Sequence, residues 1–285
     1  PFVCSFLLVK LQSIMPQTII VLDFGSQYTQ VIARRIREAN VYSRVIPYNS
    51  SLTEIKKLKP LGIVLSGGPA SVLSKGAPKP NKGIFNLGIP VLGICYGLQL
   101  MANMLGGKVE KSQRREYGRG KLNILKKSIL FKDLPSELTV WNSHGDALNH
   151  IPNGFRPAAK TENSSFAAIE EPKKKFYGLQ FHPEVVHTII GSKLIENFIL
   201  KVAKIKARWK IENFLENKII KLRKEIGNCK VVCGLSGGVD SSVAAALLDK
   251  AIGRNLVCIF VDHGLLRKNE SKEVIVNFKK YSSGR

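Results

Sequence analysis

Short apolar runs alternate with amphipathic stretches along most of the chain. Buried strands are predicted by runs rich in apolar residues at 18–22, 41–46, 62–65, 90–92 and 176–181. Apolar side chains recur at helical spacing in 30–39 and 98–105, which predicts helices between strands. Strands that alternate with helices form a parallel sheet covered on both faces, so we expect an α/β domain of this kind.

A second series of elements follows after residue 204. Residues 209–226 form an amphipathic, charged helix, which is either a linker or the first helix of a new domain. A strand at 230–234, an alanine-rich helix at 243–252 and a strand at 256–261 come next. Because two strands cannot bury the faces of a sheet, we expect this part to be marginally stable on its own.

The chain is strongly basic, with a formal net charge of +23 over 285 residues and a pI near 9.9. Such a charge suggests nucleic acid or an anionic surface as a partner. Here the positive residues are mostly lysines, spread along the chain without interleaved aromatic residues. We therefore expect no nucleic-acid binding, although it stays open as an alternative.

The five cysteines are odd in number and scattered along the chain, which argues against a disulfide framework and indicates a reducing, cytoplasmic location. Cys229 and Cys233 are spaced too widely for a zinc knuckle, so no metal site is predicted. The apolar run at 6–9 is too short to span a membrane and has no basic leader or cleavage site. We expect Met15 to be the start and residues 1–14 to be a non-native or disordered extension.

Cys95 lies between Gly93 and Gly97, where a predicted strand passes into a predicted helix. We interpret this as a nucleophile elbow, in which the glycines permit a sharp turn and the cysteine side chain is left exposed. The start of the helix favours thiolate over thiol, and the thiolate is the nucleophile. A small buried cysteine that only packs is the alternative from this stretch alone.

Two further segments add to this chemistry. The turn Ser66-Gly67-Gly68-Pro69 can present bare backbone N–H groups to a ligand, as an oxyanion hole requires. His182 and Glu184 follow the predicted strand at 176–181, and a nucleophilic cysteine needs a base that a carboxylate orients. Cys95, His182 and Glu184 therefore form a candidate catalytic triad.

Together these motifs resemble the class I, triad-type glutamine amidotransferases, over residue 18 to about residue 204. The resemblance implies a flavodoxin-like mixed sheet, with Cys95 attacking glutamine, His182 protonating the leaving ammonia, and Glu184 orienting His182. It also assigns the oxyanion hole to Gly68 and Tyr96. By the same resemblance, the amino and carboxylate groups of glutamine are held by Gln99, Ser143, Gly145 and Asp146. The last three residues belong to a polar segment, 141–146, that we expect to be a loop.

Between the strand at 230–234 and the next helix lies a loop rich in glycine and serine, which can cradle an anion at the start of that helix. It lacks the lysine of a Walker A loop. It resembles the loop of ATP pyrophosphatases, the adenine nucleotide alpha-hydrolase-like (PP-loop) group, which implies binding of ATP and substrate-bound Mg²⁺. The predicted ATP-binding residues are Ser236, Gly237, Gly238, Val239, Asp240, Ser241 and Ser242.

An amidotransferase followed by a PP-loop domain resembles the family of glutamine-hydrolysing GMP synthases. The resemblance implies glutamine, ATP and xanthosine monophosphate (XMP) as substrates. The expected domains are 15–204 for the amidotransferase, 205–229 for a connecting helix, and 230–285 for the first part of a truncated ATP pyrophosphatase domain. We expect a monomer that does not bind membranes and is competent at most for glutamine hydrolysis. A PP-loop enzyme acting on tRNA and an inactive remnant stay open as alternatives.

Overall fold

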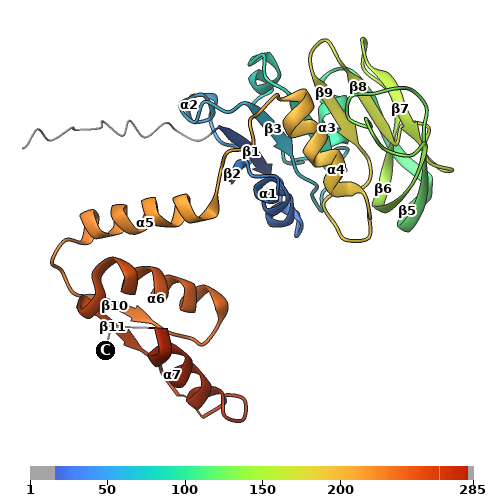
Figure 1. Cartoon of the computed structure of the whole chain (residues 1–285). Helices are drawn as coiled ribbons and strands as arrows, with labels where there is room; N and C mark the ends of the chain where they lie inside the picture. Colours follow the sequence, from blue (N-terminus) through green and yellow to red (C-terminus); the bar gives the residue numbers. More distant parts are fainter. Residues whose placement is uncertain (1–16, 263, 282–285) are drawn as a thin grey trace, which may run out of the picture. The chain divides into compact units, whose positions relative to one another are not determined.

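The computed structural model describes residues 17–262 and 264–281 of the chain (Figure 1). The extension predicted at 1–14, together with Met15, lies outside the described residues. The chain divides into two compact units, with the boundary between Trp209 and Lys210. The domain limits at 204 and 229 stay predictions.

The first unit is built on a nine-stranded mixed sheet with the order β2-β1-β3-β4-β9-β8-β7-β5-β6. Its first five strands in this order run parallel to their neighbours. The elements of the parallel part are β1 (Thr18–Asp23), α1 (Thr29–Glu38), β2 (Tyr42–Pro47), α2 (Leu52–Lys57), β3 (Gly62–Leu65), η1 (Lys82–Asn86), β4 (Val91–Ile94), α3 (Tyr96–Met104) and β9 (Phe176–Leu179).

The remaining strands pair antiparallel and extend the sheet on one side. They are β5 (Lys108–Ile124), β6 (Glu137–His150), β7 (Arg156–Lys160) and β8 (Ala168–Glu171). The mixed sheet implied by the resemblance is thus confirmed. The strands expected from the apolar runs form its parallel part, and the antiparallel strands were not expected from those runs. The segment 141–146 is not a loop but lies within β6, where its polar residues pair with β5.

The core lies on both faces of the sheet. Along β1, Ile19 and Val21 belong to one buried cluster, and Ile20 and Leu22 to another. Since side chains alternate across a strand, these clusters lie on opposite faces. Helix α1 and helix α4 (Gly191–Glu196) contribute to the first cluster, and α3 contributes to the second (Figure 1). A π-helical turn, η2 (Asn197–Val202), follows α4.

The second unit is a small two-stranded parallel sheet with helices. Its elements are α5 (Ile211–Ile226), β10 (Val231–Gly234), α6 (Val239–Ile252), η3 (Gly253–Asn255), β11 (Leu256–Ile259) and α7 (Glu270–Tyr281). Helix α5 has no buried residue, and Arg223 ties it to α6 by donating to the carbonyl oxygens of Ala251 and Lys250. Apolar side chains of the sheet such as Val232 and Ile259 are exposed. The low stability expected for this part stays a prediction.

Helix α3 begins very close to the sheet because Gly97 has no side chain. A Cβ atom at Gly97 would lie 2.3 Å from the carbonyl oxygen of Leu65, at the end of β3. A Cβ atom at Gly93 would lie 2.6 Å from the carbonyl oxygen of Gly97. Both neighbours are backbone atoms held in regular structure, so neither can give way as a flexible side chain would. The two glycines therefore set how near the start of α3 lies to β3 and β4.

Gly97→Ala is expected to lower the free energy of unfolding of the first unit by about 1–3 kcal/mol, the usual cost of overpacking. Alanine favours a helix over glycine by about 0.8–1.0 kcal/mol, which does not offset a backbone clash. Urea unfolding followed by tryptophan fluorescence measures this unit alone, since Trp141 and Trp209 both lie in it. Gly145→Ala is the matched control, because its Cβ atom would meet only ordinary contacts at 3.6 Å or more. Equal stabilities of the two variants would contradict the close approach.

Candidate active site

Four neighbouring parallel strands, β1, β3, β4 and β9, end at one edge of the sheet. In sheets of this type, ligands bind just beyond the carboxyl ends of the strands. The segments that leave this edge begin after Asp23, Leu65, Ile94 and Leu179. They carry most of the residues that the sequence singles out for chemistry on glutamine.

Cys95 is the residue that joins β4 to α3. It has a positive φ of 51° with ψ of −106°, an uncommon conformation for a residue other than glycine, and it is the N-cap of α3. Its backbone N–H donates to the carbonyl oxygen of Leu179 at 2.7 Å, which fixes the turn to β9. The predicted elbow is present, but its turn is made by Cys95 itself, while Gly93 and Gly97 supply close packing.

The side chain of Cys95 is not exposed as expected, since only 6% of its surface is accessible. It is buried because α3 packs so near the strands. Its thiol donates to the carbonyl oxygen of Ser143 at 3.7 Å, and Gln180 Nε2 lies 3.9 Å from the sulfur. Cys95 lines the cavity described below.

His182 and Glu184 lie in the turn after β9 and are both buried. Nδ1 of His182 lies 2.8 Å from Oε1 of Glu184, and the His182 side chain is also hydrogen-bonded to Cys95. The backbone N–H of His182 donates to the carbonyl oxygen of Trp141 at 2.9 Å, and Thr188 Oγ1 donates to the carbonyl oxygen of His182 at 2.6 Å. The fold thus brings the three residues of the predicted triad together in one hydrogen-bonded chain.

Two residues that the sequence analysis did not single out contact His182 and Glu184. Arg35 lies on α1, and Tyr28 lies just before it. Arg35 Nε donates to the carbonyl oxygen of Glu184 at 3.0 Å. The ring of Tyr28 meets the imidazole of His182 edge-on, with centroids 5.3 Å apart. Neither residue has a sequence signal of its own, because each acts only through a contact that the fold creates.

The surroundings of His182 favour its charged form. Burial disfavours the charged imidazole, but hydrogen bonds to Cys95 and Glu184, with the negative charges of these groups, raise the pKa of His182 to about 10. At neutral pH His182 is therefore a proton donor next to the sulfur of Cys95.

A cavity of about 290 Å³ opens in front of Cys95. Gly68 at its wall admits no side chain, since a Cβ atom there would lie 2.8 Å from the carbonyl oxygen of Phe24. Tyr96 is the first residue of α3, so its backbone N–H has no acceptor within the helix. The lining residues are Gly68, Pro69, Ala70, Ser71, Cys95, Tyr96, Gln99, Tyr117, Ser143, His144, Gly145 and Asp146.

All the residues predicted to bind glutamine line this cavity, on α3 and β6. Gln99 is buried, and its Nε2 donates to the carbonyl oxygen of Asp146 at 2.8 Å and to Gln180 Oε1 at 3.2 Å. Asp146 Oδ2 accepts a hydrogen bond from Ser71 Oγ. Gln99 therefore fixes the backbone of β6 and the segment after β9 as well as facing the cavity.

His144, one of the lining residues, belongs to a buried polar group that the sequence analysis missed. Nδ1 of His144 lies 3.1 Å from the carbonyl oxygen of Asp146, and its Nε2 lies 3.1 Å from Oε2 of Glu116. A carbonyl oxygen only accepts, so Nδ1 carries a proton. Thr161 Oγ1 donates to Glu116 Oε2 at 3.1 Å. This polar group connects β6 to β5 next to Asp146. Its sign in the sequence was His144, which lies within the polar segment 141–146.

The predicted ATP-binding residues lie in the second unit, between β10 and the first turn of α6. Helix α6 begins at Val239 rather than at 243, because the hydroxyl groups of Ser241 and Ser242 donate to the carbonyl oxygen of Gly238 and fold into its first turn. Asp240 lies in the same turn. The loop therefore ends at Gly238, and the motif residues from Val239 onward lie in α6.

The remaining loop residues are held by hydrogen bonds within the motif. The backbone N–H of Ser236 donates to Ser241 Oγ at 3.2 Å, and the backbone N–H of Gly238 donates to Ser236 Oγ at 3.3 Å. Gly237 has a φ of +81°, which glycine adopts without strain. The start of α6 is thus presented to solvent in a preformed turn, as an anion site requires.

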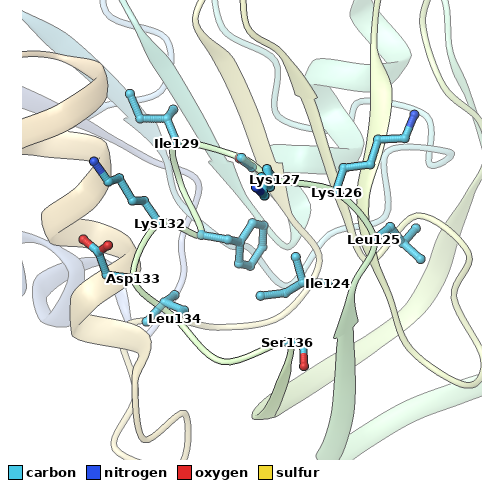
Figure 2. Close-up of a pocket in the computed structure, with 11 residues that line it drawn as sticks. Ile124, Leu125, Lys126, Lys127, Ile129, Lys132, Asp133, Leu134 and Ser136 are labelled. Atoms are coloured by element: carbon cyan, nitrogen blue, oxygen red, sulfur yellow. The ribbon is translucent and has the colours of Figure 1, made fainter.

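A larger cavity, of about 710 Å³, lies in the first unit, in the segment that follows β5. It shares no lining residue with the cavity in front of Cys95. Figure 2 shows Lys132 and Asp133 at one side of it and Lys126 and Leu125 at the other. Its lining contains no cysteine or histidine, so it offers no nucleophile or base of the kind found at Cys95.

Within residues 17–262 and 264–281, no helix is long and apolar enough to cross a membrane. The same described residues contain no group of three or more His, Cys, Asp or Glu that is arranged to hold a metal ion.

The model of the glutamine amidotransferase class-I family matches residues 20–202, which carry the cavity and the triad. The chain belongs to this family. The NAD synthase family model matches residues 208–280, so a class-I amidotransferase fold is followed by the start of a PP-loop domain. Both parts of the predicted fold class are confirmed.

Among curated proteins, the chain is 54% identical over 264 residues to a glutamine-hydrolysing GMP synthase of Acetivibrio thermocellus, covering 93% of this chain and 52% of that protein. It is 51% identical over 261 residues to the enzyme of that name from Aquifex aeolicus, covering 92% and 51%. The resemblance to GMP synthases is thus confirmed. The chain spans about half the length of these relatives.

Solved structures agree with this assignment of the first unit. A protein from Thermoplasma acidophilum, named as a putative GMP synthase subunit, is 31% identical, with a TM-score of 0.61, over 66% of this chain and 94% of that one. A glutamine amidotransferase from Thermotoga maritima is 19% identical, with a TM-score of 0.54, over 66% and 98%, which shows the fold alone. The expected monomer and the expected lack of nucleic-acid binding stay predictions.

Cys95→Ala is expected to lower the pKa of His182 from about 10, because it removes a hydrogen bond and a negative charge that stabilise the imidazolium. NMR titration of labelled histidines measures the change, with the resonance assigned by its loss in His182→Gln. Cys229→Ala, which changes an exposed thiol, is the control and should leave the pKa as it is. An unchanged pKa in Cys95→Ala would show that the two side chains do not interact.

Glu116→Gln is expected to destabilise the first unit by about 1–3 kcal/mol at pH 7. Burial acts to raise the pKa of Glu116, but hydrogen bonds from His144 and Thr161 and the charge of His144 hold it below its ordinary value of 4.5. The stability that this carboxylate contributes is present above pH 4.5 and is lost as the pH falls through its folded pKa. The difference between Glu116→Gln and the unchanged chain should therefore shrink in acid.

Urea unfolding at several pH values, followed by tryptophan fluorescence, measures this difference. Glu137→Gln is the control, since Glu137 is exposed and pairs with Lys121 at 3.3 Å on the surface. A difference that does not depend on pH would mean that Glu116 is not a carboxylate in the folded protein.

Proposed function

We propose that the first unit hydrolyses the side-chain amide of glutamine to glutamate and ammonia. The observation that carries this proposal is the hydrogen-bonded series of buried side chains Cys95, His182 and Glu184. Its first member, Cys95, lines a cavity large enough for one amino acid. A cysteine that merely packs would not need a charged histidine beside it.

In the first step the thiolate of Cys95 attacks the carbon of the glutamine amide and forms a tetrahedral intermediate. The negative charge moves to the amide oxygen, which accepts hydrogen bonds from the backbone N–H groups of Gly68 and Tyr96. His182 gives its proton to the nitrogen, the carbon–nitrogen bond breaks, and ammonia leaves. Glu184 keeps the imidazole in the orientation that this transfer requires.

In the second step His182 takes a proton from water, which attacks the glutamyl thioester. The carbon–sulfur bond breaks, glutamate leaves, and the thiolate of Cys95 is restored. Donors aimed at the oxyanion act again here, and the loss of one such donor costs about 10²–10³ in rate.

The amino and carboxylate groups of glutamine are held at the end of the cavity formed by β6 and α3. Asp146 supplies a negative charge for the ammonium group, and Ser143, Gly145 and Gln99 supply polar groups around it. His144 contacts the carbonyl oxygen of Asp146, and Glu116 contacts His144, so the two residues hold this part of β6 in place.

For the whole protein we propose the reaction named for its relatives, in which ammonia aminates XMP to GMP at the expense of ATP. The residues 236–242, at the start of α6, would hold the phosphates of ATP, which enters with Mg²⁺ as substrate. We assign XMP to no residue of this chain. These substrates suit the cytoplasm, where we place the protein.

Ammonia release from glutamine by the purified chain tests the proposal. Cys95→Ala should lower the rate by at least about a thousandfold, since it removes the nucleophile. Cys229→Ala is the matched control, because its thiol is exposed and lies in the second unit, and it should keep the full rate.

Release that survives in Cys95→Ala would refute the triad. The assay is repeated with ATP and XMP, and GMP is measured separately with the complete protein. Ammonia without GMP would refute the second half of the proposal and leave the first intact.

A further inference from the structure

The second unit contains two cysteines placed opposite each other. Strands β10 and β11 pair in parallel, and Cys233 of β10 stands directly across from Cys258 of β11. Adjacent strands lie about 4.7–4.9 Å apart, which falls within the Cα separation of about 4.4–6.8 Å found for disulfides. The backbone geometry therefore permits a bond between the two residues.

The side chains of these cysteines point to the same side of the sheet and interact. Burial raises the pKa of the Cys258 thiol, and the charge of Cys233 together with a hydrogen bond to Cys233 acts in the same direction, as does the charge of Asp249 on α6. Both cysteines are free and only partly buried. The register of the strands therefore places two partly buried thiols next to each other on one face of the sheet.

We propose that Cys233 and Cys258 form a reversible disulfide by exchange with a small disulfide such as oxidised glutathione. The thiolate of one cysteine attacks the reagent and forms a mixed disulfide, releasing one molecule of reduced thiol. The other cysteine then attacks the protein sulfur of that mixed disulfide and releases the second. The protein loses two hydrogen atoms with two electrons, and the reagent gains them.

The bond would lie at the base of the predicted ATP-binding segment. Cys233 and Cys258 each stand one residue before the end of their strand. The turn with Ser236 follows the first strand, and Asp262 follows the second. A disulfide between them would therefore link the two strands close to the ends from which these segments leave.

The test uses the full chain incubated with oxidised glutathione, followed by alkylation of free thiols, trypsin digestion and mass spectrometry. Cleavage after Lys230, Lys250, Arg254 and Arg267 gives the peptides 231–250 and 255–267, each with one of the two cysteines. We expect these peptides to be joined, and to separate when a reducing agent is added. Alkylation of both cysteines after oxidation, or glutathione retained on either, would overturn the proposal.

Cysteine variants serve as matched controls. Cys233→Ser and Cys258→Ser should each abolish the joined peptide, whereas Cys229→Ser, which changes the exposed neighbouring thiol, should keep it. A joined peptide that contains Cys229 in its place would show that the wrong pair has been assigned.

Oxidation of the unaltered chain in concentrated urea separates the effect of the sheet from that of sequence proximity. The unfolded chain should give a mixture that includes pairs with Cys229, while the folded chain gives the single pair. The same mixture from both samples would mean that the register of β10 and β11 does not direct the bond, and the proposal would fail.

Discussion

The close approach of α3 to the sheet is the constraint on which the candidate active site depends. Gly93 and Gly97 leave room for backbone only, so the helix begins directly against β3 and β4. Cys95 makes this connection with a positive φ and with its N–H bonded to β9. Packing forces on the helix thus hold the sulfur in a fixed position.

The same packing explains why the sulfur and its partners are buried. Cys95 and His182 have little access to solvent, and Glu184 has none. In such surroundings hydrogen bonds and charges act over a lower dielectric than in water, which is why Cys95 and Glu184 outweigh the cost of burying a charged imidazole. Solvent exposure of the kind expected for an elbow would have weakened this interaction.

The two units differ in how well their own residues cover the faces of their sheets. In the first, both faces of the sheet are covered and β1 is buried on each side. In the second, strands β10 and β11 keep apolar side chains such as Val232 and Ile259 exposed, and α5 buries none of its residues. The thiol chemistry proposed for Cys233 and Cys258 therefore concerns the more open of the two units.

Local pattern determined the five strands of the parallel half with α1 and α3, the candidate triad residues and the turn before α6, because apolar runs, glycines and polar residues at strand ends are signals within a few positions. It did not predict α2 or η1. The long strands β5 and β6 were missed, since their mixed polar pattern acquires meaning only when they pair with each other and join β7. The positive φ at Cys95 and its burial, the support from Arg35 and Tyr28, and the pair of His144 with Glu116 were decided by tertiary structure. Each depends on groups far apart in the sequence whose distance only the packed fold sets.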